Sequence, residues 1–357
     1  MAIFCLLCGG DSLESDISYV SYKKIKQELK YSNIATIDVY LNRFGEFYLI
    51  ENNKLKKGQF VKHNEECFFK TKFKKYYFDA VLPIVHGKGV EDGSLGAYFD
   101  ILKIPCMYSG ITNASLLQNK SYFKKILDSY DIPNVSYVDL SYYQYIDVNF
   151  DLEKHVGKLQ FPLIVKPVNL GSSIGVKKVY DMESLLEALD KAFSYDSDVL
   201  IEQCVESLKE VNIALLGYKD NIIVSELETV SNKDDVLTFF DKYLLSKEKT
   251  TRIIPSDISK DKKEIIIFLS KKVFRLLDCF GVVRLDFLLD EENSKVYLNE
   301  INTIPGSLAY YLFEPININV AKMIDILYGF YLKKVKDDLR RLTSYEESNK
   351  KDLLSKE

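Results

Sequence analysis

Two short segments near the carboxyl end of the sequence combine charged and amide side chains. Arg284 and Asp286 stand two positions apart in the first segment, and Glu300 and Asn302 stand two positions apart in the second. Side chains two positions apart on a β-strand lie on the same face, so a hairpin of these segments brings two carboxylates and an amide oxygen beside a guanidinium. Oxygen ligands of this kind suit Mg²⁺, which also binds phosphate oxygens. The spacing therefore predicts a magnesium site.

The alternative is a solvated strand face whose charges form salt bridges. The neighbours Leu285, Phe287, Leu298 and Ile301 are apolar, which indicates that the opposite face of the hairpin is buried. The chain has 42 Lys but only six Arg, so an Arg on an apolar hairpin is a rare choice. Both observations favour metal binding.

A second cluster joins a strand that ends at Lys166 to a loop of small residues. The loop at 171–175 reads Gly-Ser-Ser-Ile-Gly and can expose backbone N–H groups that bind phosphate oxygens, while Lys166 adds a positive charge. The order differs from the P-loop, because here the Lys precedes the glycines. An ordinary turn is the alternative for this loop taken alone.

A third segment ends a strand with apolar residues that can flank a flat purine ring. Ile201, Cys204 and Val205 are the apolar residues, with Glu202 among them and Glu210 a short distance on. The alternative is an ordinary connection between domains.

His86 opens a loop rich in glycine and polar residues, 86–93, directly after an apolar strand. A histidine at that place can contact a ligand, and a histidine that only stabilises the fold is an equal alternative.

Cys5 and Cys8 have the spacing of a redox or metal pair. Because they lie in a strand-like apolar run with no second Cys or His pair nearby, we predict buried strand cysteines instead.

The composition bounds the class of protein. The 357 residues exceed one usual domain, and 47% are hydrophobic, so two or three domains with sizeable cores are expected. A net charge of -4 does not favour nucleic acid as the main partner, and no apolar run approaches a membrane span. The first ten residues do not resemble a signal peptide. We expect a cytoplasmic protein with neither nucleic acid nor a membrane as partner.

Apolar runs alternate with helical stretches in the first third, which predicts βαβ units and a largely parallel sheet. Residues 231–252 are polar and aperiodic, typical of a long loop that closes over a site. The last stretch, 333–357, predicts a solvated helix or a frayed tail. Expected strands are 3–7, 34–40, 47–51, 59–62, 78–85, 161–167, 199–202, 210–216, 221–227, 281–289 and 295–302; expected helices are 18–29, 113–130 with Asn113 as N-cap, 182–192, 260–280 and 316–332.

Taken in order, these motifs resemble the D-alanine–D-alanine ligases of the ATP-grasp superfamily. The matching stretches, which extend from residue 3 to about residue 315, are 9–14, 86–93, Lys166-Pro167, 171–175, 241–243, 284–286 and 299–306. The resemblance implies an α/β N-terminal doubly wound domain followed by a two-part ATP-grasp fold of α+β type. The implied division is 1–112 for the first substrate, 113–202 and 203–335 for the ATP grasp with a lid at 231–252, and a charged tail at 336–357.

The resemblance also implies the reaction. The γ-phosphoryl group of ATP moves to the carboxylate of one D-alanine, and the amine of a second D-alanine displaces phosphate, as in peptidoglycan precursor synthesis. Two Mg²⁺ ions, which Mn²⁺ can replace, are expected on Asp286, Glu300 and Asn302. The implied ATP contacts are Lys120, Lys166, Glu202, Val205, Glu210 and Lys242. A homodimer is expected.

By the same resemblance, Arg284 and the Gly306 amide stabilise the oxyanion of the tetrahedral intermediate. Glu14 orients the ammonium of the first substrate, near His86. Glu14, Ser172 and Tyr243 form a hydrogen-bonded set that closes the lid.

Two positions depart from the family pattern. Tyr311 stands where a Ser contacts the carboxylate of the second substrate, and Gly96-Ala97 replaces the usual Gln-Gly. A pocket change of this size is worth about 1–3 kcal/mol in discrimination between acceptors. The alternatives are therefore the same chemistry with D-serine or another amino-acid acceptor, or a nucleotide-binding relative without catalysis.

The βαβ start alone would also suit a dinucleotide-dependent oxidoreductase, but no Gly-x-Gly-x-x-Gly follows the first strand.

Overall fold

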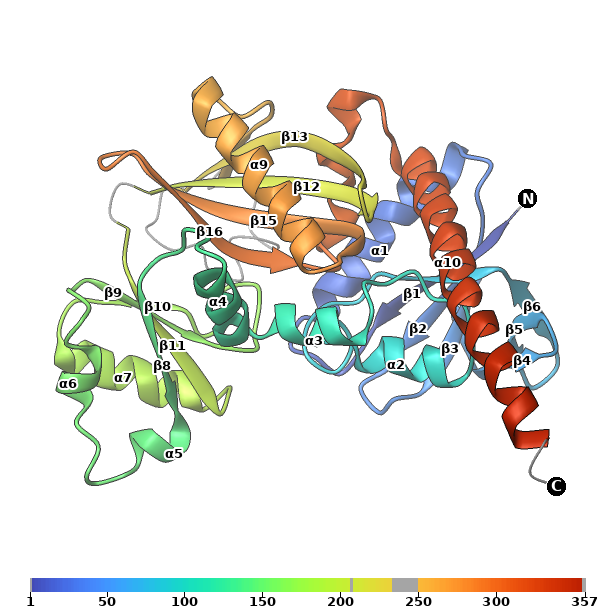
Figure 1. Cartoon of the computed structure of the whole chain (residues 1–357), viewed down its shortest axis with the longest axis horizontal. Helices are drawn as coiled ribbons and strands as arrows, with labels where there is room; N and C mark the ends of the chain where they lie inside the picture. Colours follow the sequence, from blue (N-terminus) through green and yellow to red (C-terminus); the bar gives the residue numbers. More distant parts are fainter. Residues whose placement is uncertain (1, 206–207, 233–249, 355–357) are drawn as a thin grey trace.

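The computed structural model describes residues 2–205, 208–232 and 250–354. These residues form three β-sheets of seven, four and five strands, which follow one another along the chain and carry helices on their faces (Figure 1). A mixed α/β sheet is thus followed by two antiparallel sheets, as the expected fold class requires. Within the described ranges no helix has both the length and the apolar character that a membrane crossing requires.

The N-terminal sheet has the strand order β6-β5-β4-β3-β2-β1-β7. Its strands are β1 Ile3–Gly9, β2 Ala35–Leu41, β3 Phe47–Glu51, β4 Lys54–His63, β5 Glu66–Thr71, β6 Lys75–Phe78 and β7 Ala80–Pro83. β1 lies parallel to β2 and β7, but each pairing from β2 to β6 is antiparallel. The largely parallel sheet predicted from the sequence is therefore limited to three strands, because short turns join the others. Cys5 and Cys8 are buried in β1 with free thiols, which confirms the prediction of buried strand cysteines.

The central sheet is antiparallel, in the order β10-β9-β11-β8. Its elements, with the helices around it, are α3 Ile111–Gln118, α4 Lys120–Ser129, β8 Tyr137–Ser141, α5 Tyr142–Tyr145, α6 Leu152–Val156, β9 Leu163–Pro167, β10 Lys177–Val179, α7 Met182–Phe193 and β11 Asp198–Gln203. The single helix predicted from Asn113 is wrong. Asn119 has an extended backbone, and its side chain accepts the Tyr122 N–H, so it ends α3 and caps α4.

The C-terminal sheet is also antiparallel, in the order β14-β13-β12-β15-β16. Its elements are β12 Leu208–Tyr218, β13 Asn221–Asn232, β14 Thr250–Ile253, α9 Lys260–Leu276, β15 Phe280–Asp290, β16 Lys295–Asn302, two 3₁₀ segments η2 Gly306–Leu312 and η3 Glu314–Ile316, and α10 Val320–Leu354. The predicted loop at 231–252 loses both ends to β13 and β14, and 233–249 lie outside the described residues. The tail beyond residue 333 continues α10.

One apolar core joins the N-terminal sheet to the C-terminal sheet. α1 (Ser15–Glu28) and α2 (Ser94–Ile101) follow the first and last strands of the N-terminal sheet, and α10 crosses it (Figure 1). Phe4 of β1 meets Tyr328 of α10 edge to face at 5.1 Å between ring centroids, and Phe280 of β15 meets Tyr331 of α10 at 6.4 Å. The helix therefore fixes the first sheet against the third, and with it the loops at their edges.

A buried carboxyl group joins loops from the two ends of the chain. Glu91 accepts hydrogen bonds from the backbone N–H of Gly87 at 3.0 Å and of Ile304 at 3.3 Å. Burial raises the pKa of Glu91 to about 8, and the nearby Glu14 adds to the shift. The folded protein therefore holds a proton on Glu91 at neutral pH.

We expect Glu91→Gln to change how stability depends on pH. Between about pH 4.5 and pH 8 the folded chain keeps the Glu91 proton and the unfolded chain loses it, so this group makes the free energy of unfolding fall as pH rises. The slope is at most about 1.4 kcal/mol per pH unit, and the variant should lack it. Urea unfolding across that pH range measures the slope. Glu66→Gln, at an exposed position, is the control, and an unchanged slope in Glu91→Gln would contradict the assignment.

Candidate active site

The hairpin of β15 and β16 brings the predicted oxygen ligands together. Asp286 lies directly opposite Glu300, and Arg284 lies directly opposite Asn302. The register shifts just beyond Asp286, because Asn299 is an extra residue between the Glu300 and Leu298 pairings. This β-bulge lets Leu298 enter the core while Glu300 and Asn302 face the site, which strict alternation would not allow.

Arg284 holds Asp286 through two hydrogen bonds. Its Nε and Nη2 atoms each lie 2.7 Å from a different oxygen of the Asp286 carboxylate. Asn302 Nδ2 donates to the same carboxylate at 3.3 Å. A bidentate pair fixes both planes, so the guanidinium and the carboxylate are oriented before any ligand arrives.

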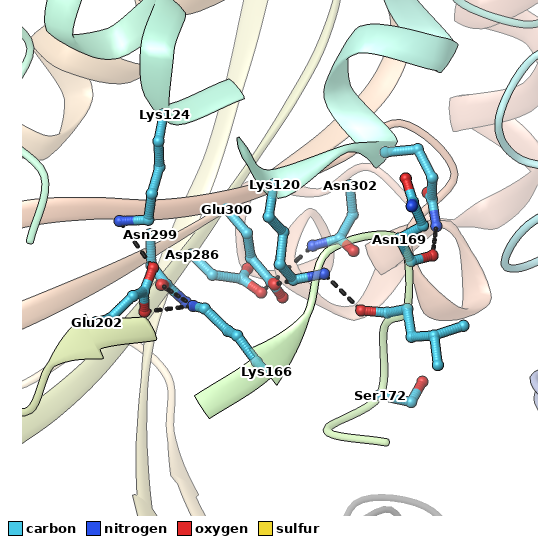
Figure 2. Close-up of polar contacts among 12 residues, drawn as sticks. Lys120, Lys124, Lys166, Asn169, Ser172, Glu202, Asp286, Asn299, Glu300 and Asn302 are labelled. Atoms are coloured by element: carbon cyan, nitrogen blue, oxygen red, sulfur yellow. Dashed lines mark hydrogen bonds and ion pairs between the residues drawn. The ribbon is translucent and has the colours of Figure 1, made fainter. Parts of the chain in front are cut away.

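Lys120 reaches the hairpin from the first turn of α4. Its ammonium lies 4.0 Å from Glu300 Oε2 and donates to the Leu170 carbonyl at 2.5 Å. Figure 2 shows Lys120, Glu300, Asp286 and Asn302 pointing toward a common region. Lys120 therefore links α4, the glycine loop and the hairpin.

Beside this group, one buried carboxylate is shared by two lysines. Glu202 of β11 lies 2.8 Å from Lys124 Nζ and 2.5 Å from Lys166 Nζ, and all three side chains are less than 10% exposed. Lys166 also donates to Asn299 Oδ1 at 3.3 Å (Figure 2). Burial alone would raise the pKa of Glu202, but the two ammonium groups outweigh it and hold that pKa below its ordinary value. Burial lowers the pKa of Lys124, although Glu202 opposes the shift.

Contacts of Asn169 hold the start of the glycine loop. Asn169 donates its backbone N–H to Asp196 at 2.7 Å and bonds the side chain of Asn119 at 3.0 Å. Ser172 and Ser173 adopt left-handed backbone angles, with φ of 54° and 59°. Non-glycine residues in this region indicate strain that the surrounding contacts maintain.

Glu14 lies where the loop meets the N-terminal sheet. Ser172 Oγ donates to Glu14 Oε1 at 2.5 Å, so two of the three residues in the expected hydrogen-bonded set are in contact. A Cβ at Gly87 or Gly171 would lie 2.7 or 2.8 Å from the Glu14 carboxylate, so both glycines make room for it. Burial raises the pKa of Glu14, while the Ser172 hydrogen bond and the positive charge of Lys120 oppose that shift.

His86 is buried between α1 and the segment after β16. Its Nε2 lies 3.1 Å from Ser21 Oγ, and the backbone of Ile304 bonds the ring. Burial lowers the pKa of His86 to about 4, so the imidazole is neutral at pH 7. It can position the loops around it but supplies no positive charge.

Gly306 begins η2, in a strained stretch. The next three residues, Ser307, Leu308 and Ala309, have φ values between 47° and 53°. Each left-handed L-residue costs about 1–2 kcal/mol, so the surrounding packing must impose this conformation. Ser307 N–H donates to Ser21 Oγ at 3.0 Å, which ties η2 to α1 and to His86.

Tyr311 belongs to a buried polar cluster on β12, β13 and β14. Its hydroxyl donates to Glu228 Oε1 at 2.8 Å, and Asn212 Nδ2 donates to the same oxygen at 3.0 Å. Arg252 lies over the Tyr311 ring at 5.3 Å and 3.5 Å from Glu228 Oε2. Burial and Glu228 raise the pKa of Tyr311, so its hydroxyl stays protonated and engaged with Glu228.

Gly96-Ala97, the second departure from the family pattern, has a physical reason. A Cβ on Gly96 would lie 2.1 Å from the Tyr108 ring, so this ring fills the space that a larger residue would need. The Tyr108 hydroxyl donates to Asp100, which fixes the ring in place.

The remaining predicted site residues are either half-buried on β11 and β12 or lie outside the described ranges. Val205 is half-buried just after β11, and Glu210 is half-buried on β12, where it pairs with Val230 and Leu288. Lys242 and Tyr243 lie among residues 233–249, outside the described residues.

Sequence reasoning missed Lys124, Asn299 and the Glu228 cluster. Lys124 had a readable signal, because it stands four positions after Lys120 and three before the buried Leu127 on one helix face. Asn299 and Glu228 had none, because the bulge and the packing of η2 depend on tertiary contacts.

Asp286, Glu300 and Asn302 offer two carboxylates and an amide oxygen from paired strands, and oxygen ligands of this kind suit Mg²⁺. Among the described residues no group of three His, Cys, Asp or Glu side chains could hold a metal ion. A Mg²⁺ ion on this hairpin would take its remaining ligands from phosphate oxygens or water. Lysines from α4 and β9 border the same region. The arrangement suits a triphosphate.

Comparison with known proteins agrees with this arrangement. The family model described as D-ala D-ala ligase N-terminus matches residues 3–109, and that of the C-terminus matches 126–321. The D-alanine–D-alanine ligase of Thermosipho africanus is 32% identical, with 96% of each chain covered. The structure of D-alanine–D-alanine ligase from Helicobacter pylori is 30% identical with a TM-score of 0.71 and covers 92% of this chain and 99% of that one. VanG D-Ala:D-Ser ligase from Enterococcus faecalis is 24% identical with a TM-score of 0.78, covering 92% and 99%, and shares the fold.

The C-terminal model alone spans more than half of the chain and includes the hairpin, the glycine loop and Glu202. The N-terminal model includes Glu14 and His86. These matches confirm the expected fold class, a pre-ATP-grasp domain followed by an ATP-grasp fold. The chain belongs to the D-alanine–D-alanine ligase family.

Proposed function

We propose that the chain is an ATP-dependent ligase that joins two D-alanines through an acyl phosphate, for peptidoglycan precursors. The observation that carries this proposal is the buried charge beside the hairpin. Lys124 and Lys166 share the single carboxylate of Glu202, so the cluster holds one more positive charge than negative. A buried excess charge is costly unless a ligand compensates it, and a phosphate chain would.

ATP would lie between the central and C-terminal sheets. Lys120 and Lys166 would contact its phosphates, with Lys242 at the transferring group. Glu202, Val205 and Glu210 would bound the adenosine end, with Glu202 acting through its lysines. Asp286, Glu300 and Asn302 would hold two Mg²⁺ ions. Bound there, the metal would neutralise charge on the triphosphate.

The amino-acid end of the site would lie nearer the N-terminal sheet. Glu14, fixed by Ser172, would accept the ammonium of the first D-alanine, and Tyr243 would complete that set. Arg284 and the Gly306 amide would stabilise the oxyanion as the second amine attacks. His86 would position η2 and the 86–93 loop around the substrate.

We further propose the domain division 1–112, 113–202 and 203–335, with the lid at 231–252 and the tail at 336–357. The proposed setting is a cytoplasmic homodimer, with D-alanine and ATP as substrates.

The proposal also concerns which amino acid accepts the acyl group from the acyl phosphate. Tyr311 replaces the expected Ser, and its hydroxyl is engaged with Glu228, so it offers the acceptor carboxylate no free donor. D-Alanine is proposed as acceptor, and D-serine is the second candidate because of this position.

An acceptor panel tests the reaction directly. With ATP, Mg²⁺ and D-alanine, mass detection should find the D-alanyl-D-alanine dipeptide and an equal amount of phosphate. D-Lactate should give no ester product, and D-serine should give less product than D-alanine. Absence of phosphate release with every D-amino acid would overturn the proposal.

The same panel with Tyr311→Ser tests the pocket. The smaller side chain should raise the ratio of kcat/KM for D-serine over D-alanine by about tenfold or more. Tyr310→Ser, next to it in η2, is the matched control and should leave the ratio unchanged.

Arg284→Ala should lower kcat by about 10²- to 10³-fold while nucleotide affinity stays nearly unchanged, because the guanidinium acts on the developing oxyanion. Arg284→Lys should recover only part of the rate, because Lys cannot make the paired bonds to Asp286. Steady-state kinetics and fluorescence titration with an ATP analogue separate the two effects. Arg275→Ala, whose Arg pairs with Asp220 on the surface, is the control. Full turnover without Arg284 would refute its role.

Asp286→Asn should raise the Mg²⁺ concentration needed for half-maximal activity by about tenfold or more. Binding of Mn²⁺ to the ATP complex, followed by electron paramagnetic resonance, should weaken in parallel. Asp290→Asn, at the far end of the same strand, should behave as the parent protein. Unchanged Mn²⁺ binding in Asp286→Asn would remove Asp286 from the ligand set.

A further inference from the structure

One row of polar side chains crosses the C-terminal sheet from the hairpin to β13. Glu300 lies opposite Asp286, and Asp286 lies opposite Asn212 on β12. Asn212 lies in turn opposite Glu228 on β13. Directly paired residues of antiparallel strands carry their side chains on the same face of the sheet. The proposed metal ligands and the buried cluster around Glu228 therefore share one face.

Arg252 reaches this face from β14, at the other end of the strand order from β16. It pairs with Val230, which stands two positions after Glu228, so the Arg252 side chain lies on the same face as Glu228. The Arg252 guanidinium lies over the Tyr311 ring, 5.3 Å from its centroid. η2, which carries Tyr311, packs against β12, β13 and β15. Arg252 therefore stands beside the residue that departs from the family pattern at the acceptor position.

Glu228 holds Arg252 loosely. One oxygen of Glu228 accepts hydrogen bonds from Tyr311 and Asn212, and its other oxygen lies 3.5 Å from Arg252 Nη1. That distance is the long limit of a hydrogen bond. The Glu228 side chain is fully buried, whereas the Arg252 side chain is 47% exposed. Glu228 therefore orients the guanidinium without enclosing it, and the planar group can receive a carboxylate on two of its five N–H donors.

Arg252 and Arg284 act on the same hydroxyl group. Burial raises the pKa of Tyr311, and the positive charges of Arg284 and Arg252 both oppose that shift. Arg284 also acts electrostatically on Arg252, so the two guanidinium groups are near each other. In the proposed reaction Arg284 faces the carbon that the acceptor amine attacks, and an α-amino acid has its carboxylate two bonds from that amine. A second guanidinium beside Arg284 is therefore placed for the acceptor carboxylate.

We propose that Arg252 binds the carboxylate of the acceptor amino acid and so selects acceptors that carry one. It supplies the donor that is lost where Tyr311 replaces the expected Ser, because the Tyr311 hydroxyl is engaged with Glu228. Glu228 and the Tyr311 ring position the guanidinium, and the paired N–H groups match a carboxylate in shape and charge. This assignment rests on the proposed ligase function. The competing explanation is that Arg252 only balances the charge of the buried Glu228.

Competition between two acceptors tests the assignment. D-Alaninamide keeps the amine and the methyl group of D-alanine but has no carboxylate, so it can act as acceptor and not as donor. With ATP, Mg²⁺, D-alanine and D-alaninamide, liquid chromatography with mass detection measures D-alanyl-D-alanine and D-alanyl-D-alaninamide. The parent protein should strongly favour the first product.

Arg252→Gln should lower the ratio of D-alanyl-D-alanine to D-alanyl-D-alaninamide by about tenfold or more, with the amide product nearly unchanged. Arg252→Lys should lower the ratio less, because it keeps the charge and loses the paired donors. Arg275→Gln is the matched control and should keep the parent ratio. The Arg275 side chain is 49% exposed and pairs with Asp220 on the surface.

The double variant Glu228→Gln/Arg252→Gln separates binding from charge balance. If Arg252 binds the acceptor carboxylate, the double variant should keep the low ratio of Arg252→Gln. If Arg252 only compensates Glu228, removal of both charges should restore the parent ratio.

Three outcomes would rule out the assignment and leave the ligase function standing. They are an unchanged ratio in Arg252→Gln, an equal fall of both products, and recovery of the ratio in the double variant. If Arg252→Gln does not fold, Arg252→Lys decides, because it keeps a positive charge beside Glu228, and an unchanged ratio there counts against the assignment. Absence of both products from the parent protein would disprove the ligase function, and the role of Arg252 with it.

Discussion

The register of β15 and β16 is the constraint on which the candidate site depends. Asp286 faces Glu300 only because the bulge at Asn299 shifts the pairing by one residue. If residues 298–300 alternated regularly without the bulge, Leu298 and Glu300 would lie on one face, and either a leucine would leave the core or a carboxylate would enter it. The same bulge places Asn299 against Lys166, so one local irregularity connects the hairpin to the buried lysines.

The electrostatics follow from that arrangement. Each carboxylate near the hairpin already faces a cation, as Asp286 faces Arg284 and Glu202 faces two lysines. Exposed ion pairs contribute little, but buried ones cost desolvation that only good geometry offsets. The excess positive charge of Lys124 and Lys166 over Glu202 is therefore tolerable if this site binds an anion. Asp286 and Glu300 on the hairpin offset part of that positive charge, and a bound metal ion would in turn neutralise these two carboxylates.

Sequence reasoning succeeded where local periodicity decides the structure. The hairpin, the strand ending at Lys166 and the buried cysteines of β1 follow from alternation and from apolar runs. It failed where one polar side chain competes with the backbone, as Asn119 does in dividing a predicted helix. It also could not place Tyr311 on Glu228, because that contact joins η2 to β13 through a left-handed stretch that no local preference predicts.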